Sequence, residues 1–340
     1  MVNVTVIGGG VNGVGTALAL LQKVPHCKLT LISDQLSPYT TGDGAAGFWG
    51  PHLSEGTPEE KILSWSSAGW ELFKSWHNNK PEMGVSKVPG VTLSRDEELT
   101  LEPWRHIPDD YTVLNQDQLR TYGPDYRYGY SYTSYVAEPS TFLPIMMQEI
   151  ETLGGQIKQQ RITCFEDLAQ DSDLIINCSG IGARDLVPDP NVYPIRGQVM
   201  RVRAPWIRHY ICDDSLENFC YILPNFSSNT VVLGGTAYED DWNLEVDPKD
   251  KSKIWNNCLN AMPELKNCEF VRDWVGLRPG RRNGIRIEED LITLGTRKVP
   301  VVHNYGHGGS GVTMFWGCSQ EAAGLAQDII HKNWGPQSKL

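Results

Sequence analysis

A glycine-rich loop near the N-terminus is the first segment whose residues could do chemistry. Residues 8–13 read Gly-Gly-Gly-Val-Asn-Gly and fit the pattern G-x-G-x-x-G, directly after a β-branched run at residues 4–7. In this pattern Gly8 allows a tight turn, Gly10 lets a pyrophosphate approach the backbone, and Gly13 lets the next helix pack on the strand. The start of that helix presents free N–H groups and the positive end of its dipole, which suit phosphates.

An acidic residue follows at the spacing expected for ribose binding. A second apolar strand is predicted at residues 28–33, and Asp34 comes directly after it, 21 residues beyond Gly13. An acid about 20 residues after the last glycine bonds ribose hydroxyls in dinucleotide-binding units. Strand, glycines, helix, strand and acid fall in order, so the sequence predicts a dinucleotide-binding βαβ unit. A glycine-rich structural turn is the alternative, and these residues leave open which dinucleotide binds.

Two late segments carry the other candidate groups. Arg278 lies in residues 275–282, where arginines stand beside glycine and proline residues typical of turns. Residues 300–313 predict a short strand and then a glycine-rich turn, and a helix is expected through residues 320–326. This order repeats that of the N-terminus, so N–H groups at the helix start could hold an anion or the electron-rich edge of a ring. A second structural turn is the alternative.

Hydrophobic patterning divides the chain between two kinds of sheet. Residues 173–180 form an apolar run of the kind that is buried on both faces of a parallel sheet, so they are expected to rejoin the N-terminal unit. Alternation at residues 126–132 and 196–203 predicts antiparallel strands, and the aromatic residues of 65–76 predict a buried helix. We predict an α/β fold, with a Rossmann-type cofactor-binding domain and an interleaved, mostly antiparallel β-sheet substrate domain. The first domain is assigned residues 1–50, 140–182 and 277–340, and the second is assigned residues 51–139 and 183–276.

The composition excludes several classes of partner. The chain has 340 residues and a net charge of −11, which argues against nucleic acid and against an anionic membrane surface. It has no run of about 18 apolar residues, so no membrane span is expected. Its eight cysteines form no C-x-x-C pair, which argues against a metal site or a disulfide framework. An anionic substrate would need a local basic pocket.

Five motifs in consistent order resemble the D-amino-acid oxidase family of FAD-dependent flavoproteins. They are Val6–Gly13, Gly44–Gly47, Arg196–Val199, Gly276–Pro279 and His303–Gly309, and the similarity extends over nearly the whole chain. The resemblance implies FAD as cofactor and a small-molecule D-amino acid and oxygen as substrates. The amino acid would become an imino acid, which hydrolyses to a 2-oxo acid and ammonia, and oxygen would become hydrogen peroxide.

The resemblance also implies roles for individual residues. Arg278 would hold the substrate α-carboxylate, Tyr221 would hydrogen-bond the same group, and the carbonyl of Gly309 would accept from the amine. A planar guanidinium suits this role because it meets a carboxylate with two parallel hydrogen bonds. The implied cofactor contacts are Gly8, Gly10, Val11, Asn12, Gly13, Asp34, Thr40, Thr41, Ala46, Gly47, Ile162, Ser179, Gly308, Gly309, Ser310, Gly311, Val312 and Thr313.

Substrate preference depends on a smaller set of residues. Asp241–Leu244, Pro300–His303 and His52 resemble the D-aspartate oxidase branch, which favours acidic substrates such as D-aspartate. That branch usually has arginine where this chain has Ala237, so another group must hold a second carboxylate. The candidates are His52, Ser310 and Arg282. The alternatives are an oxidase of neutral D-amino acids, an NAD-dependent dehydrogenase and a flavin-binding protein without activity.

The last three residues suggest a location. Ser338-Lys339-Leu340 at a C-terminus is an address that the peroxisomal import receptor reads, so we expect the peroxisomal matrix. A frayed polar tail is the alternative.

Deleting Ser338–Leu340 should abolish import without affecting chemistry, because a receptor-read address takes no part in the site. A fluorescent fusion of the truncated chain should be diffuse in the cytosol, and the lysate should keep its activity. The intact fusion is the control, and a punctate pattern for the truncated chain would refute the address.

Overall fold

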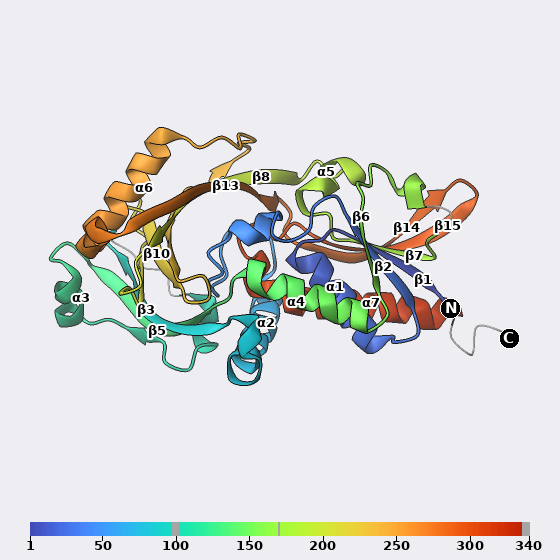
Figure 1. Ribbon diagram of the computed structural model, residues 1–340, viewed down its shortest axis with the longest axis horizontal. Coiled ribbons are helices and arrows are strands. Elements are labelled where there is room, and N and C mark those ends of the chain that lie inside the picture. The colour runs from blue at the N-terminus through green and yellow to red at the C-terminus, as the bar shows by residue number, and fades with distance from the viewer. Residues whose placement is uncertain (97–101, 169–170, 335–340) are drawn as a thin grey trace.

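The computed structural model describes residues 1–96, 102–168 and 171–334, and these form two β-sheets side by side (Figure 1). The tripeptide Ser338–Leu340, which is predicted to be a peroxisomal address, lies outside the described residues. No helix within the described residues is long and apolar enough to cross a membrane.

The first sheet contains the N-terminal unit. Its spatial order is β14 (Arg286–Leu294), β15 (Arg297–Tyr305), β7 (Leu174–Asn177), β1 (Asn3–Ile7), β2 (Lys28–Ser33) and β6 (Gln156–Gln159). The strands β15, β7, β1, β2 and β6 run parallel, and β14 is antiparallel to β15. The four residues of β7 are all buried, as an interior strand of a covered parallel sheet requires. The prediction that residues 173–180 return to this unit is confirmed.

Long helices cover one side of this sheet (Figure 1). They are α1 (Val11–Lys23), α4 (Pro139–Thr152) and α7 (Gly311–Trp334). The helix α2 (Glu59–Asn79) crosses α7 closely, because Gly69 and Gly317 bring backbone against backbone. A Cβ at Gly69 would lie 2.0 Å from the carbonyl oxygen of Thr313. The aromatic residues of α2 are buried, as predicted; they are Trp65, Trp70, Phe73 and Trp76.

The second sheet is mostly antiparallel. Its order is β12 (Tyr238–Glu239), β8 (Val192–Arg203), β11 (Thr230–Gly234), β10 (Cys220–Asn225), β9 (Tyr210–Asp213), β3 (Ser86–Ser94), β5 (Tyr128–Val136) and β4 (Thr112–Val113), with β13 (Glu269–Arg281) on the other side of β8. The shorter helices are α3 (Gln116–Tyr122), α5 (Ala183–Leu186) and α6 (Pro248–Ala261), and α6 packs on β8, β10 and β11. These sheets and helices confirm the predicted fold class.

The two longest strands, β8 and β13, form an antiparallel ladder that reaches from one sheet toward the other (Figure 1). The expectation of turns around Arg278 is wrong, because residues 275–281 continue β13 as a strand. Pro279 is tolerated because it lies opposite Pro194, so neither residue needs a backbone N–H at that pair. The Pro279 carbonyl instead accepts from Gly308 N at 2.8 Å, which ties β13 to the late glycine turn.

Candidate active site

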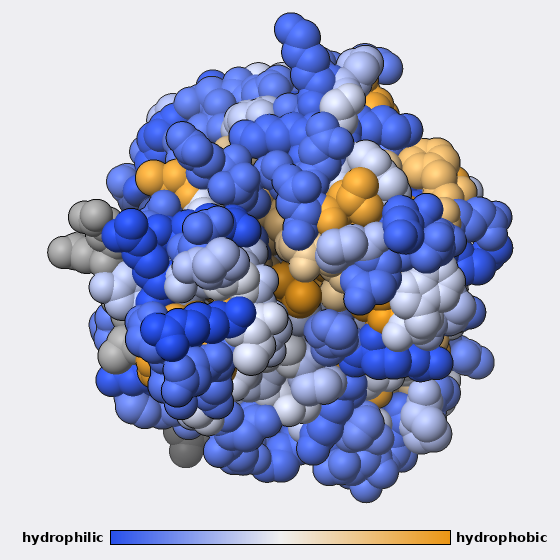
Figure 2. Space-filling model, turned by 90° about the vertical axis from the view of Figure 1, so that its left-hand side faces the viewer, coloured by the Kyte–Doolittle hydropathy of each residue, from blue (hydrophilic) through white to orange (hydrophobic). Residues whose placement is uncertain are grey.

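A single cavity of about 790 Å³ joins the two sheets. At one end it meets the loops that follow β1, β2 and β7, and at the other it meets the face of the second sheet. The open edge beyond the carboxyl ends of parallel strands is where such sheets bind ligands. Figure 2 faces the end of the molecule formed by the second sheet and shows a hollow near its centre, where apolar side chains appear between polar ones.

The first end has an empty cradle of backbone at the start of α1. Gly10 caps this helix without a side-chain hydrogen bond, and a Cβ added at Gly10 would meet nothing within 4 Å. The first helical hydrogen bond runs from Val14 N to Gly10 O, so the N–H groups before it have no partner within the helix. The first turn carries no acidic residue. These features fit a diphosphate.

The other glycines of the loop bring the backbone elements together. Gly8 has φ of 116°, in the left-handed region, and a Cβ there would lie 2.3 Å from the Cys178 carbonyl oxygen. A Cβ on Gly13 would lie 1.9 Å from the Gly8 carbonyl oxygen. Gly13 therefore packs helix on strand and, unlike Gly8 and Gly10, does not line the cavity.

Most of the remaining predicted cofactor contacts line the same end of the cavity. These are Val11, Asn12, Asp34, Thr40, Thr41, Ala46, Gly47, Ile162 and Ser179. Asp34 follows β2 directly and is exposed, which suits an acid that accepts from ribose hydroxyls. The Thr40 hydroxyl is already engaged, since it donates to Asp43 at 2.6 Å. These residues fit FAD, whose diphosphate and ribose groups need this combination of free N–H groups and a carboxylate.

The late glycine turn packs on the segment that contains His52. Gly308, Gly309, Gly311 and Val312 line the cavity, whereas Ser310 and Thr313 do not. The Ser310 hydroxyl donates to His52 O at 2.8 Å and accepts from His52 N at 2.7 Å. The Thr313 hydroxyl bonds the backbone of Gly50 in the same way, at 3.1 Å. In this structure Ser310 and Thr313 fasten the Gly50–His52 backbone to the start of α7.

Arg278 lies at the middle of the cavity, where its guanidinium rests on bare backbone. A Cβ at Gly197 would lie 2.5 Å from Arg278 Nη1 and 2.6 Å from its Cζ, so only glycine leaves room at that position of β8. Arg278 Nη1 donates to Thr236 O at 3.0 Å. No carboxylate of the described residues forms an ion pair with Arg278, so its charge is available to an anion.

Tyr221, which is on β10, lies beside Arg278. Its ring lies against Gly234 and Gly235, where an added Cβ would fall 2.0 Å from Tyr221 Cζ and 2.6 Å from Tyr221 Oη. Burial raises the pKa of the Tyr221 phenol, and the Arg278 charge opposes that shift only in part. The phenol is therefore protonated and can donate to a carboxylate held by Arg278.

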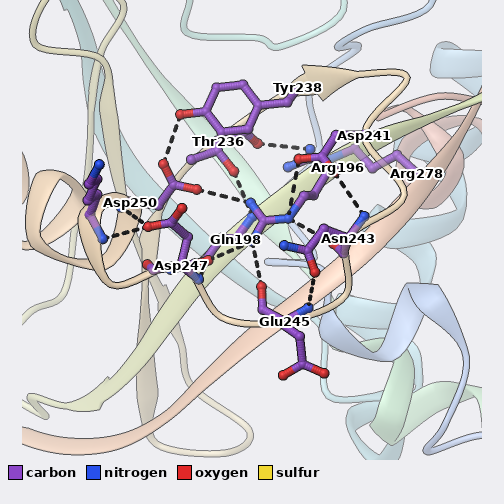
Figure 3. A network of polar contacts seen from close by, with 11 residues as sticks. Arg196, Gln198, Thr236, Tyr238, Asp241, Asn243, Glu245, Asp247, Asp250 and Arg278 are labelled. Carbon is purple, nitrogen blue, oxygen red and sulfur yellow. Dashed lines mark hydrogen bonds and ion pairs between the residues drawn. The ribbon is translucent and has the colours of Figure 1, made fainter.

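A buried arginine holds the segment between β12 and α6, which follows Thr236 along the chain (Figure 3). Arg196 is 1% exposed and pairs with Asp250 at 3.0 Å. It also donates to the carbonyl oxygens of Asn243 at 2.8 Å and Glu245 at 2.7 Å. Because breaking a buried, hydrogen-bonded ion pair is costly, Arg196 fixes the loop between β11 and α6 against β8.

His52 lines the cavity but carries no charge there. Burial in the cavity and the nearby Arg278 charge lower the pKa of His52 to about 4, although the side chain remains accessible from the cavity itself. The imidazole is therefore neutral around pH 7 and can offer one N–H donor and one acceptor.

Several lining residues were not identified from the sequence. Trp274 lies flat against Gly44 and Gly276, where an added Cβ would approach its ring within 1.8 and 2.0 Å. His307 is buried, its Nε2 has no hydrogen-bond partner among the described residues, and burial lowers its pKa to about 3. Glu102, Trp104, Tyr130, Asp214, Phe219 and Trp242 also line the cavity. The available sequence signals were the alternation at residues 126–132, which includes Tyr130, and the alternation of Trp274, Gly276 and Arg278 along β13.

Gly10→Ala should weaken FAD binding without unfolding the protein. The new Cβ meets no protein atom but fills the cradle, so we expect at least ~10-fold weaker FAD binding, or about 1.4 kcal/mol, and a change below ~1 kcal/mol in apoprotein stability. Titration of apoprotein with FAD and thermal melting measure the two effects. Gly324→Ala on α7, which also meets nothing, is the control. Unchanged FAD affinity in Gly10→Ala would contradict the cradle.

Comparison with known proteins places the chain in a family. A family model described as FAD dependent oxidoreductase matches residues 3–325. A D-amino acid oxidase of Dugesia ryukyuensis is 36% identical, covering 97% of this chain and 99% of that protein. The human D-aspartate oxidase is 34% identical, covering 96% of this chain and 95% of that protein.

Solved structures share the fold at lower sequence identity. The glycine oxidase from Bacillus cereus has a TM-score of 0.75 at 18% identity, covering 98% of this chain and 97% of that one. An L-alpha-glycerophosphate oxidase from Mycoplasma pneumoniae with FAD bound has a TM-score of 0.70 at 15% identity, covering 96% and 95% of the two chains. The chain therefore belongs to the FAD-dependent oxidoreductase family, and it is an enzyme whose cofactor is FAD.

Proposed function

We propose that the protein oxidises D-amino acids. The reaction converts a D-amino acid, oxygen and water into a 2-oxo acid, ammonia and hydrogen peroxide. The observation that carries the proposal is the unpaired Arg278 guanidinium beside the protonated Tyr221, in the same cavity as the glycine cradle. The relatives named D-amino acid oxidase and D-aspartate oxidase, at 36% and 34% identity, support the same reaction.

The chain's own residues bind and orient the substrate. Arg278 presents a planar fork that receives the α-carboxylate, and Tyr221 adds one hydrogen bond that fixes the plane. A carboxylate held at two points leaves the Cα little freedom, which supplies orientation. Bound FAD would supply the acceptor for the two electrons and the hydrogen of Cα, so no side-chain base would be needed. The Gly309 carbonyl, at the turn that lines the cavity, is the proposed acceptor for the amine.

The predicted preference for acidic substrates finds little support among the residues proposed for it. His52 is neutral, so it offers a hydrogen bond and no charge. The Ser310 hydroxyl is engaged with the His52 backbone. Arg282 does not line the cavity and pairs at the surface with Asp240 at 2.5 Å. A second carboxylate would therefore enter the cavity without a positive partner, which is costly.

Two further assignments remain proposals. We propose that the two sheets mark two interleaved domains with the predicted boundaries, because the strands of the first sheet all fall within residues 1–50, 140–182 and 277–340. The contact of α2 with α7 crosses that division. We also propose delivery to the peroxisomal matrix through the import receptor, which rests on Ser338–Leu340 alone.

Arg278→Leu should remove the α-carboxylate anchor and cost at least ~3 kcal/mol of transition-state stabilisation. Arg278→Lys should also be poor, because an ammonium cannot make the planar fork. Peroxide release with D-alanine measures kcat/KM, and absorbance confirms bound flavin. Arg203→Leu and Arg203→Lys, at an exposed arginine on β8, are matched controls. Near-normal kcat/KM in either Arg278 variant would remove this role.

Gly197→Ala should disturb the same anchor without replacing a charged residue. Its Cβ would lie 2.5 Å from Arg278 Nη1, so the guanidinium must move, and overpacking of this kind costs roughly 1–3 kcal/mol. We expect KM for D-alanine to rise while FAD stays bound with unchanged affinity. Gly324→Ala again serves as the control. A variant with wild-type kcat and KM would show that Arg278 does not need the space above Gly197.

A further inference from the structure

The second sheet presents one row of cavity-lining residues beyond the carboxylate anchor. Tyr221 on β10 lies opposite Cys212 on β9, Cys212 pairs with Thr92 on β3, and Thr92 pairs with Tyr130 on β5. All four residues line the cavity. Since neighbouring strands lie about 4.8 Å apart, the row extends roughly 14 Å from the Tyr221 backbone. A substrate held at Tyr221 and Arg278 has this row available for its side chain.

Two carboxylates line the cavity along this row. Asp214 follows β9 two residues after Cys212, so it falls on the same face. Its N–H donates to Leu93 O at 2.8 Å, which keeps it in register with β3. Glu102 lines the cavity as well. Burial first and then the Asp214 charge raise the pKa of Glu102, as expected for two acids that line one cavity.

No described cation forms an ion pair with either carboxylate. Arg95 pairs with Asp213 and bonds Tyr126. Arg105 donates to the backbone carbonyl of Glu102 at 3.2 Å and leaves its carboxylate free. The Trp104 indole N–H lowers the pKa of Glu102, yet Trp104 Nε1 is buried without a hydrogen bond of normal geometry. The two carboxylates and this unpartnered indole N–H thus line the same cavity.

Charge divides the substrate part of the cavity into two ends. Among the described lining residues there, Arg278 supplies the positive charge at one end, His52 is neutral, and Asp214 and Glu102 supply the negative charge at the other. A substrate whose α-carboxylate pairs with Arg278 would therefore direct its side chain toward Asp214 and Glu102.

We propose that this cavity selects D-amino acids with a cationic side chain, such as D-lysine, D-ornithine and D-arginine, whose side-chain cation pairs with Asp214 and Glu102. The inference rests on the proposed oxidation of D-amino acids and names its substrate class. The cation would supply the positive partner that the two carboxylates lack. Each charged group that loses water on binding would then be paired with an opposite charge.

The dimensions agree with such a substrate. Asp214 lies two residues beyond Cys212, which pairs with Tyr221 on the neighbouring strand. This offset places the backbones of Asp214 and Tyr221 roughly 8 Å apart. The ammonium of an extended lysine lies about five bonds, or roughly 6 Å, from its Cα. Carboxylate side chains at the far end close the remaining gap. The side chain of D-aspartate is shorter than that of D-lysine. It would also bring a third negative charge toward Asp214 and Glu102.

The first test compares substrates that differ in charge at matched length. Purified holoenzyme is assayed for peroxide release with D-lysine, D-norleucine, D-glutamate, D-aspartate and D-alanine. D-norleucine has the lysine chain without the ammonium, so the ratio of the two kcat/KM values reports the charge. We expect D-lysine to exceed D-norleucine by at least ~10-fold, the scale of one charged hydrogen bond. We expect D-aspartate and D-glutamate to be the poorest of the panel.

The second test assigns the effect to the two carboxylates. Asp214→Asn and Glu102→Gln keep size and polarity, and each should lower the D-lysine to D-norleucine ratio of kcat/KM at least ~5-fold. Glu217→Gln, at an exposed acid of the same loop, is the matched control. Enclosure in the cavity and the Asp213 charge raise the pKa of Asp214 to about 6, although its side chain is accessible from the cavity. The wild-type ratio should therefore fall as pH drops below about 6 and Asp214 is protonated, with Glu102 and Tyr130 the other titratable groups at this end.

The outcomes separate this inference from the proposed function. Oxidation of D-alanine and D-norleucine with a D-lysine ratio near one, or unchanged ratios in both variants, would overturn the cationic preference and leave the oxidase standing. A D-aspartate rate above all others would overturn it in favour of the acidic branch. No peroxide from any D-amino acid with flavin bound would overturn the proposed function itself.

Discussion

The close ladder between β8 and β13 is the constraint on which the active site depends. It carries Arg278 on one strand and Gly197 on the other, so the guanidinium lies over backbone. The same ladder places Arg196 where it holds the segment between β12 and α6. It also places Gln198 where its backbone bonds Thr236, whose carbonyl accepts from Arg278. At its far end Pro279 O accepts from Gly308 N, which connects the anchor to the turn beside the cofactor. One antiparallel pair thus sets the distance between the substrate end and the FAD end.

Glycines perform two different tasks around the cavity. Gly13, Gly69 and Gly197 remove side chains so that helix, backbone or guanidinium can approach, and a Cβ at each would collide with atoms within about 2.5 Å. Gly10 keeps space open that no protein atom occupies. The first kind of glycine shapes the protein, whereas Gly10 also lines the cavity, so the space it leaves is where a diphosphate fits. This difference separates structural from cofactor-binding positions in a motif that looks uniform in sequence.

Local patterns predicted the N-terminal unit well because its chemistry and its backbone geometry reside in the same residues. The loop at residues 8–13, the strand before it and Asp34 are contiguous signals, and the structure places them as expected. Prediction failed around Arg278, where glycine and proline suggested turns but the long partner β8 imposed a strand. The acids Asp214 and Glu102 could not be found, because both lie outside the strands and only the tertiary structure brings their segments to one cavity. Ser310 resembled a ligand contact, yet its hydroxyl is engaged with the His52 backbone.

The anaerobic half-reaction tests the account most directly. Mixing the purified protein with single D-amino acids or their L-enantiomers, without oxygen, and following the absorbance of the oxidised flavin isolates substrate oxidation from everything downstream. The account predicts rapid bleaching by D-alanine and D-lysine, no bleaching by the L-enantiomers, and loss of bleaching in Arg278→Leu with flavin still bound. Flavin that remains oxidised with every D-amino acid, or that bleaches equally well in Arg278→Leu, would contradict it.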